Sequence, residues 1–232
     1  MRVQLQHAFI LHSRPYRDSS LLLEVLTAEH GRISLVGRGS RRRSRGGSNS
    51  ALLQPFRPLL VSFGGRGELR NLQGLEAAAP PLAMRGDKLY SGLYLNELLV
   101  RLLHRHDPHP PLFAAYGAAL EELATPTPAD PVLRRFEWQL LDELGYAFDL
   151  TADGHSGEDI APELWYCYEP GHGMVPGQPR GEADAMLFHG AELLRLAAGE
   201  LDGDLRTTAR RLMRQVLAAH LGNEPLKSRD LF

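Results

Sequence analysis

Five arginines, Arg38, Arg41, Arg42, Arg43 and Arg45, lie within eight residues and are separated only by glycine and serine. A guanidinium group pairs with phosphate through two parallel N–H bonds, and glycine and serine spacers let the backbone follow an irregular polyanion. The alternative is a charge run that is simply solvated. The residue types and their spacing favour contact with the phosphates of a nucleic acid.

The charge of the chain is unevenly divided. The whole sequence of 232 residues has a formal net charge of −2 and a pI near 6.6. Residues 1–75 hold twelve of the 26 basic residues and four of the 28 acidic ones, a local charge of +8, and the remainder carries −10. This asymmetry indicates two domains with different partners. The candidate nucleic-acid-binding set is Arg14, Arg17, Arg32, Arg38, Arg41, Arg42, Arg43, Arg45, Arg66 and Arg70, with Tyr16, Phe56 and Phe63 as stacking candidates.

A second constellation combines cations with apolar residues at helical spacing. An acidic peptide that ends in an apolar residue needs a cation for its carboxylates and a pocket for its last side chain. The alternative is an amphipathic helix whose arginines are solvated. The candidate peptide-binding set is Arg101, Leu133, Arg134, Arg135, Phe136, Trp138 and Leu140.

Metal and catalytic patterns are weak or missing. His104 and His106 are two residues apart at a helix end, so their side chains point in different directions. The single Cys167, with His155 and His172, forms at best an incomplete zinc site. The sequence has no phosphate loop, dinucleotide fingerprint, nucleophile elbow or HExxH motif. We therefore expect no metal, no cofactor and no enzymatic activity.

The first third of the chain predicts β-structure. Turn signals at Arg14-Pro15, His30-Gly31, Gly37–Asn49 and Gly64-Gly65 separate runs rich in Val, Ile, Leu and Phe. Strands are expected at Val3–His12, Leu21–Ala28, Arg32–Val36, Leu59–Phe63 and Glu68–Leu75. Five short strands in about 75 residues indicate a small closed barrel, because closure removes exposed edges.

After Pro80-Pro81 the apolar spacing becomes helical. Residues 147–181 are irregular, with a possible hairpin formed by Leu164–Tyr168 and Met174-Val175. Helices are expected from Leu82 to about His104, at Leu112–Ala124, from an N-cap at Asp130 to Gly145, near Ala191–Gly199 and at Leu205–Leu221. The predicted fold class is therefore α+β, with a barrel domain at 1–79 and a helical domain at 80–232 that contains the irregular insert.

Several stretches resemble the RecO family of bacterial recombination mediators, in its gamma-proteobacterial form. They are AFILHSRPYRDSSLLLEVLTAEHGRISLVGRGSRR, ALLQPFRPLLVSFGGRGELRNL, LYSGLYLNELLVRLL, LRRFEWQLLDELGY and LGNEPLKSRDLF. Their order and coverage, from one end of the chain to the other, carry the resemblance. It implies an N-terminal five-stranded OB-fold followed by a C-terminal helical domain.

The resemblance also implies a function in DNA repair and recombination. Such a protein binds single- and double-stranded DNA, anneals complementary strands and contacts the acidic C-terminal tail of the single-stranded DNA-binding protein. With RecR it helps to load RecA. Many members carry a four-cysteine zinc site, but the matching segment here keeps only Cys167. No apolar run approaches the roughly 20 residues of a membrane span. The single Cys167 fits a reducing cytoplasm, so a cytoplasmic, nucleoid-associated protein is expected.

Two other classes remain as alternatives. An OB-fold RNA-binding protein would use the same basic barrel. A metal-dependent nuclease would need a carboxylate cluster, and the sequence suggests none.

Overall fold

The structure is a computed structural model that describes residues 2–38, 52–179, 186–222 and 224–228. Contacts within the chain group it into two units, Met1–Ala129 with Leu226–Phe232, and Asp130–Pro225. The predicted boundary between residues 79 and 80 falls just after the last barrel strand, whereas these contacts group the first two helices with the barrel.

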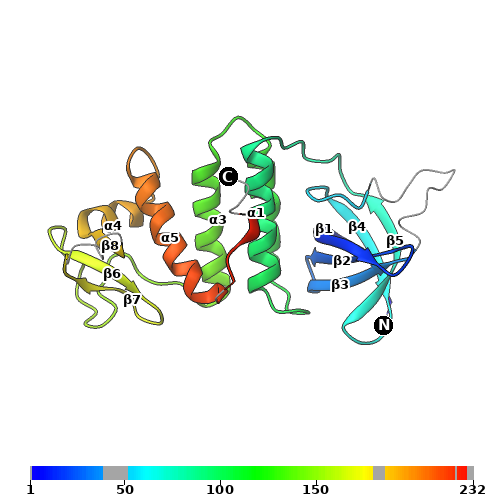
Figure 1. The fold of residues 1–232 in the computed structure, drawn as a ribbon, viewed down its shortest axis with the longest axis horizontal. Coiled ribbons are helices and arrows are strands. Elements are labelled where there is room, and N and C mark those ends of the chain that lie inside the picture. Colours follow the sequence, from blue (N-terminus) through cyan, green and yellow to red (C-terminus); the bar gives the residue numbers. More distant parts are fainter. Residues whose placement is uncertain (1, 39–51, 180–185, 223, 229–232) are drawn as a thin grey trace. The chain divides into compact units, whose positions relative to one another are not determined.

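The first unit contains a closed five-stranded barrel with the strand order β1-β2-β3-β5-β4 (Figure 1). The strands are β1 (Arg2–Tyr16), β2 (Ser20–Thr27), β3 (Gly31–Gly37), β4 (Leu59–Gly64) and β5 (Leu69–Ala77). Strands β3 and β5 run parallel, and the other neighbours run antiparallel. Alternate residues fill the interior, among them Ile10, Ile33 and Phe63. The α+β class and the OB-fold-like barrel predicted from the sequence are confirmed.

Strand β1 is long because it closes the barrel from both sides. Its first half pairs with β4 and its second half with β2, and register shifts after Val3 and after Ile10 mark the bends. The predicted turn at Arg14-Pro15 is wrong, because β1 continues to Tyr16. Pro15 pairs only with β2, so one side of the strand is unpaired at this position, where proline is tolerated.

Two helices, α1 (Asp87–Leu102) and α2 (Pro110–Leu123), also belong to the first unit. The side-chain amide of Asn96 on α1 donates to the carbonyl oxygen of Leu11 on β1 at 2.9 Å, and it accepts from the hydroxyl of Tyr116 on α2. Both side chains are buried. The predicted first helix began at Leu82, but the residues before Asp87 are not helical.

The last described residues also belong to the first unit. The carboxylate of Glu97 on α1 accepts hydrogen bonds from the backbone N–H groups of Lys227 and Ser228 at 2.9 and 2.8 Å. Leu226 is buried beside them, with 1% of its surface exposed. Burial acts to raise the pKa of Glu97, but the backbone hydrogen bonds from Ser228 and Lys227 and the charge of Arg101 outweigh it, so this pKa lies below its usual range.

The second unit combines three helices with a small sheet. Its elements are α3 (Ala129–Glu143), β6 (Trp165–Glu169), β7 (Gly173–Gly177), β8 (Leu187–His189), α4 (Gly190–Ala197) and α5 (Leu205–Leu221). The predicted hairpin is present as β6 and β7, and β8 adds a third strand on the other side of β6.

The expected N-cap of α3 at Asp130 is wrong. Helix α3 starts one residue earlier, and the Asp130 carboxylate instead forms an ion pair with Arg210 on α5.

Candidate functional sites

One end of the barrel gathers three of the predicted arginines. Tyr16 at the end of β1 pairs with Ser20, and the next residue of β2 pairs with Gly37 at the end of β3. The β1–β2 turn and the exit of β3 therefore lie at the same end of the barrel. Arg14 lies on β1 just before this turn, Arg17 is the first residue of the turn, and Arg38 follows β3 directly. All three are exposed.

Arg17 has a constrained backbone. Its φ angle is +52°, in the left-handed region, and its guanidinium carbon lies 5.2 Å from the centre of the Tyr16 ring. This cation–π contact places an aromatic ring and a cation together on the exposed turn. Of the other aromatic candidates, Phe63 is fully buried in the barrel and Phe56 is 4% exposed, so neither presents a face for stacking.

The remaining arginines are placed differently. Arg66 lies in the β4–β5 turn, and Arg70 on β5 packs its guanidinium carbon 5.5 Å from the Phe63 ring centre. Because the start of β5 runs beside Ser34 and parallel to β3, Arg66 lies toward the start of β3, away from Arg38. The other arginines of the cluster, Arg41, Arg42, Arg43 and Arg45, lie outside the described residues.

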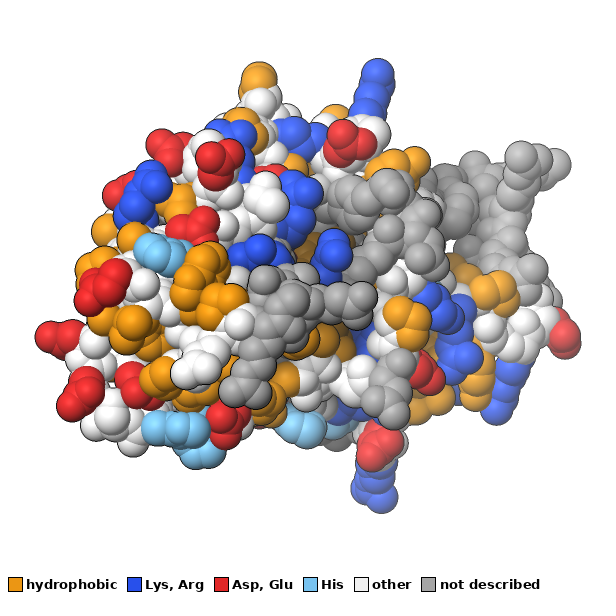
Figure 2. Space-filling view, turned by 60° about the vertical axis from the view of Figure 1, so that its left-hand side comes forward, with side chains coloured by type: hydrophobic (Ala, Val, Ile, Leu, Met, Phe, Trp, Pro, Cys, Tyr) orange, Lys and Arg blue, Asp and Glu red, His pale blue; other side chains and the backbone are white. Residues whose placement is uncertain are grey.

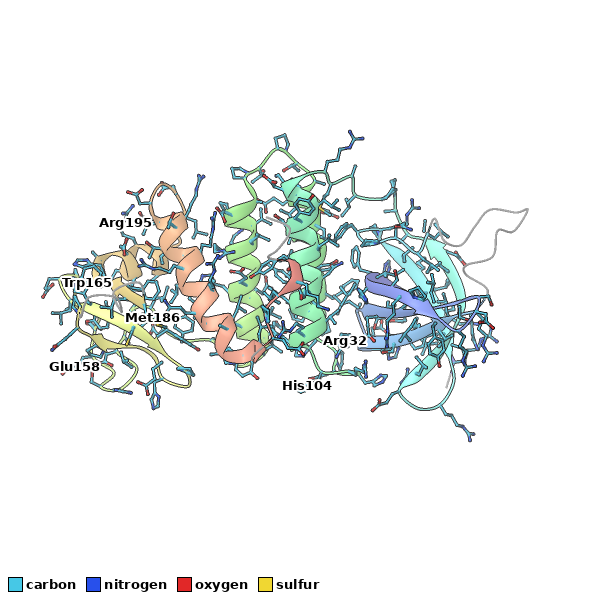
Figure 3. All side chains as sticks on the ribbon, viewed as in Figure 1. Arg32, His104, Glu158, Trp165, Met186 and Arg195 are labelled. Atoms are coloured by element: carbon cyan, nitrogen blue, oxygen red, sulfur yellow. The ribbon has the colours of Figure 1, made fainter. Side chains whose placement is uncertain are left out.

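Arg32 is held inside the first unit. Its Nη1 atom pairs with the Glu24 carboxylate at 2.7 Å, and its Nε and Nη2 atoms donate to the carbonyl oxygen of Leu103 at 3.1 and 3.0 Å. Glu24 also accepts from Arg105 and from the Ser34 hydroxyl. The labelled Arg32 side chain is drawn on the barrel in Figure 3. Unlike the predicted phosphate contact, this arrangement ties β3 to the end of α1.

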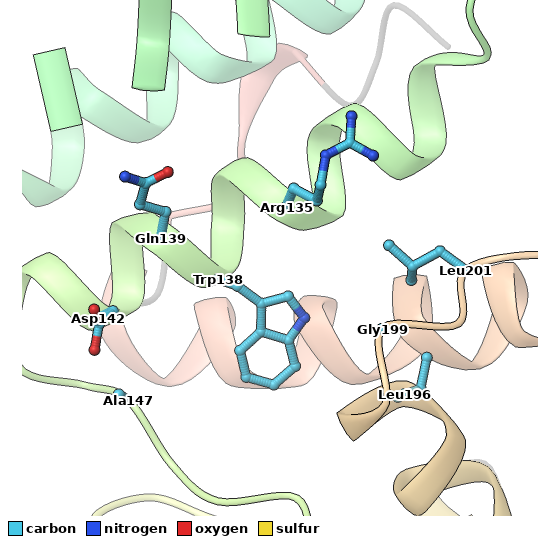
Figure 4. A pocket seen from close by; sticks show the side chains of 8 residues that line it. All are labelled: Arg135, Trp138, Gln139, Asp142, Ala147, Leu196, Gly199 and Leu201. Atoms are coloured by element: carbon cyan, nitrogen blue, oxygen red, sulfur yellow. The ribbon is translucent and has the colours of Figure 1, made fainter. Parts of the chain in front are cut away.

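A pocket of about 630 Å³ opens beside α3 in the second unit (Figure 4). One wall of the pocket includes the exposed Arg135 and the half-buried Trp138 of α3. The opposite wall comes from α4 and the turn that follows it. The Trp138 ring lies 5.0 Å from the Phe148 ring. The lining residues are Arg135, Trp138, Gln139, Asp142, Ala147, Leu196, Gly199 and Leu201.

Only two residues of the predicted peptide-binding set line this pocket. Leu133, Phe136 and Leu140 are buried. Arg134 is 5% exposed and forms an ion pair of 2.8 Å with Glu137, one helical turn away and fully buried. The last member, Arg101, lies on α1 in the first unit. Sequence reasoning missed Leu196, Gly199 and Leu201, because they come about 60 residues after α3 and no local pattern marks them.

The segment that would hold a four-cysteine zinc site does not fit one. Its single thiol, Cys167 on β6, is partly buried, and burial together with the neighbouring Glu169 charge raises the pKa of this thiol. Within residues 2–38, 52–179, 186–222 and 224–228, one group could hold a metal ion, namely His155, Glu169 and His172. The histidines at 104, 106 and 109 form no such group there.

No helix within the described residues is long and apolar enough to cross a membrane. The model of the family domain "Recombination protein O N terminal" matches residues 1–81, and that of "Recombination protein O C terminal" matches residues 85–230.

Three relatives, each named DNA repair protein RecO, match almost the whole chain. The protein of Methylococcus capsulatus is 48% identical over 100% of this chain and 93% of its own length. That of Pseudomonas paraeruginosa is 46% identical over 98% and 94%, and that of Nitrosospira multiformis is 43% identical over 99% and 95%.

The domain models and the names of the relatives place the chain in the class of DNA repair and recombination proteins, and its first unit contains an OB-fold-like barrel. More narrowly, the two domain models and the relatives show that this chain belongs to the RecO family of DNA repair proteins. The family resemblance predicted from the sequence is confirmed.

Proposed function

We propose that this protein is a non-catalytic recombination mediator. It binds single- and double-stranded DNA, anneals complementary strands and, with RecR, helps to load RecA onto DNA coated by the single-stranded DNA-binding protein. The observation that carries the proposal is the grouping of Arg14, Arg17 and Arg38 at one barrel end, from which the chain continues into the arginine cluster. A protein with this ligand would be found in the cytoplasm with the nucleoid.

Annealing requires no catalytic residue. Two DNA strands repel each other through their phosphates, and cations that neutralise these phosphates release counterions and lower the repulsion. Base pairing then supplies the driving force. Arginines at an exposed barrel end and in the adjoining arginine cluster of the sequence fit this task, because they contact the backbone of any sequence.

The acidic tail of the single-stranded DNA-binding protein would bind in the α3 pocket. Arg135 supplies the cation, and Trp138, Leu196 and Leu201 supply an apolar wall for the terminal side chain. Asp142 lines the same pocket seven residues along α3, about 10 Å from Arg135 along the helix axis. The carboxylates of the tail would therefore lie toward Arg135 and away from Asp142.

The test of the mediator function is annealing of strands already coated with the single-stranded DNA-binding protein. The triple variant Arg14→Ala, Arg17→Ala and Arg38→Ala should slow annealing. Arg214→Ala, which removes one exposed arginine on α5, is the control for loss of a positive charge outside the barrel. If the triple variant anneals as fast as the control, the barrel end is not the DNA platform. Competition between DNA and RNA strands of the same sequence tests the alternative, since preferential retention of RNA would favour an RNA-binding protein.

The test of the partner site is a pair of titrations on each variant, one with the acidic tail peptide and one with bare single-stranded DNA. Arg135→Ala should weaken peptide binding by about 1–3 kcal/mol, the scale of a charge-assisted hydrogen bond, and should leave DNA binding unchanged. Trp138→Ala should also weaken the peptide. A parallel loss of DNA affinity would mean that Arg135 belongs to a continuous DNA surface. A peptide without its terminal apolar residue controls for simple charge attraction.

A further inference from the structure

Two histidines and a glutamate, none of which lines the pocket, converge on the surface of the second unit. Glu169 at the end of β6 directs one carboxylate oxygen to each histidine. Oε2 lies 3.4 Å from Nε2 of His155, and Oε1 lies 3.2 Å from Nδ1 of His172. The two imidazole rings meet edge to face at 4.7 Å. In Figure 2, histidine side chains appear at the surface beside acidic ones.

The backbone fixes the two histidines relative to each other. His155 lies in a turn whose Gly154 N–H donates to the carbonyl oxygen of Met174 on β7 at 2.7 Å. His172 lies in the β6–β7 turn, where its N–H donates to the Glu169 carbonyl oxygen at 3.1 Å. A Cβ atom at Gly154 would lie 1.8 Å from the carbonyl oxygen of His172, so only glycine permits this close approach. The turns therefore bring the three side chains together before any ligand arrives.

We propose that His155, Glu169 and His172 form a binding site for a divalent transition-metal ion. One ligand atom from each residue lies within 4.8 Å of the others. Ligands at about 2.0–2.1 Å from a tetrahedral zinc ion are about 3.3 Å apart, and each histidine lies at about this distance from one of the two Glu169 oxygens, His155 from Oε2 and His172 from Oε1. Two imidazoles and one carboxylate suit Zn²⁺ and its neighbours Co²⁺, Ni²⁺ and Cu²⁺ better than Mg²⁺ or Ca²⁺.

The site is open rather than structural. The side chains of both histidines are 51% exposed and that of Glu169 is 43% exposed, so water would complete the coordination. An ion held in this way exchanges with solvent and joins the turn of residues 153–158 to the β6–β7 turn. The ligand set contains no thiolate and is different from a four-cysteine site.

The experiment uses the full chain without a histidine tag, treated with a chelator and transferred to chelator-free buffer. Calorimetric titration with Zn²⁺ should show one saturable equivalent, and Co²⁺ should give a visible absorption band from the bound ion. His155→Ala, His172→Ala and Glu169→Gln should each weaken binding at least about tenfold, since losing even an outer partner of a ligand costs that much. His104→Ala, an exposed histidine of the first unit, is the matched control and should bind like the unmodified protein.

Thermal melting separates binding from folding. Without metal, the variants should melt close to the unmodified protein, because the three side chains are substantially exposed. With excess Zn²⁺, the melting temperature should rise in the unmodified protein and in His104→Ala but not in His172→Ala. If the unmodified protein takes up no saturable equivalent, or if all three variants bind as it does, the cluster holds histidine–glutamate ion pairs only and the proposal is wrong.

Discussion

Replacing Arg32 with alanine distinguishes an internal role from a DNA contact. The guanidinium group pairs with Glu24 and donates twice to the Leu103 carbonyl oxygen, and the side chains of Arg32 and Glu24 are each 12% exposed. Because all three nitrogens of the guanidinium group already donate to these partners, Arg32 is poorly placed to donate to a phosphate. We therefore expect Arg32→Ala to lower stability and to leave DNA affinity unchanged.

The magnitude follows from what the substitution leaves behind. Breaking a buried ion pair by removing one partner costs about 3–5 kcal/mol. Here Glu24 keeps Arg105 and Ser34 as partners, so we expect a smaller loss of about 2–3 kcal/mol. For a chain of this size, 1 kcal/mol corresponds to about 2–4 °C, and the melting temperature should fall by roughly 4–12 °C.

Two measurements on one protein sample test this prediction. Thermal melting gives the stability, and DNA binding at several salt concentrations gives the slope of log affinity against log salt. Arg14→Ala is the control, and it should keep its melting temperature while losing about 0.7–0.9 of slope for one phosphate contact. The reasoning would be refuted if Arg32→Ala melted normally and lost the same slope as Arg14→Ala.

Three further predictions concern the rest of the chain. Neutralising Arg41–Arg43 together should weaken binding to every DNA sequence and flatten the salt slope by up to about 2–2.7, measured by titration at several salt concentrations; an unchanged slope would mean that these side chains meet no phosphate. Asn96→Ala should cost about 2–5 kcal/mol in chemical denaturation, because it removes two buried hydrogen bonds, one to the Leu11 carbonyl and one from the Tyr116 hydroxyl. A double-mutant cycle with Tyr116→Phe should then show strong coupling. Burial and the nearby Arg70 charge lower the pKa of His106. As the pH drops below about 6.5, the imidazole is therefore protonated in the unfolded chain before it is protonated in the folded one, and the free energy of unfolding should fall. Denaturation at several pH values should show a smaller fall in His106→Gln.

The barrel could be predicted from the sequence because its signals are local. Alternating apolar residues and glycine turns located all five strands to within a few residues. The error at Arg14-Pro15 has a physical reason, since proline normally ends a strand but is tolerated where one side of the strand is unpaired. To predict that Arg14, Arg17 and Arg38 lie at the same end of the barrel, the register of β1, β2 and β3 would also have to be known.

The candidate sites of the second unit could be predicted only in part. Helical spacing identified Arg135 and Trp138, but the same stripe also suggested Arg134, which turns inward to Glu137. A one-residue step on a helix rotates the side chain by 100°, so periodicity alone does not decide which of two adjacent arginines is exposed. The opposite wall comes from α4, and the partner of Asp130 is 80 residues away on α5. Residues that are so far apart in the sequence form no local pattern from which their contact could be predicted.

The anchoring of Lys227 and Ser228 by Glu97 has a consequence for the order of events during synthesis. Glu97 precedes Lys227 by 130 residues, and the entire second unit is translated between them. At about 5–20 residues per second, α1 waits on the order of 10 s for these partners after it leaves the ribosome. The barrel strands and α1 are therefore made early, but the unit that contains them is completed only by the last part of the chain. A premature stop after α5 would remove contacts from the earliest-made unit rather than from the latest.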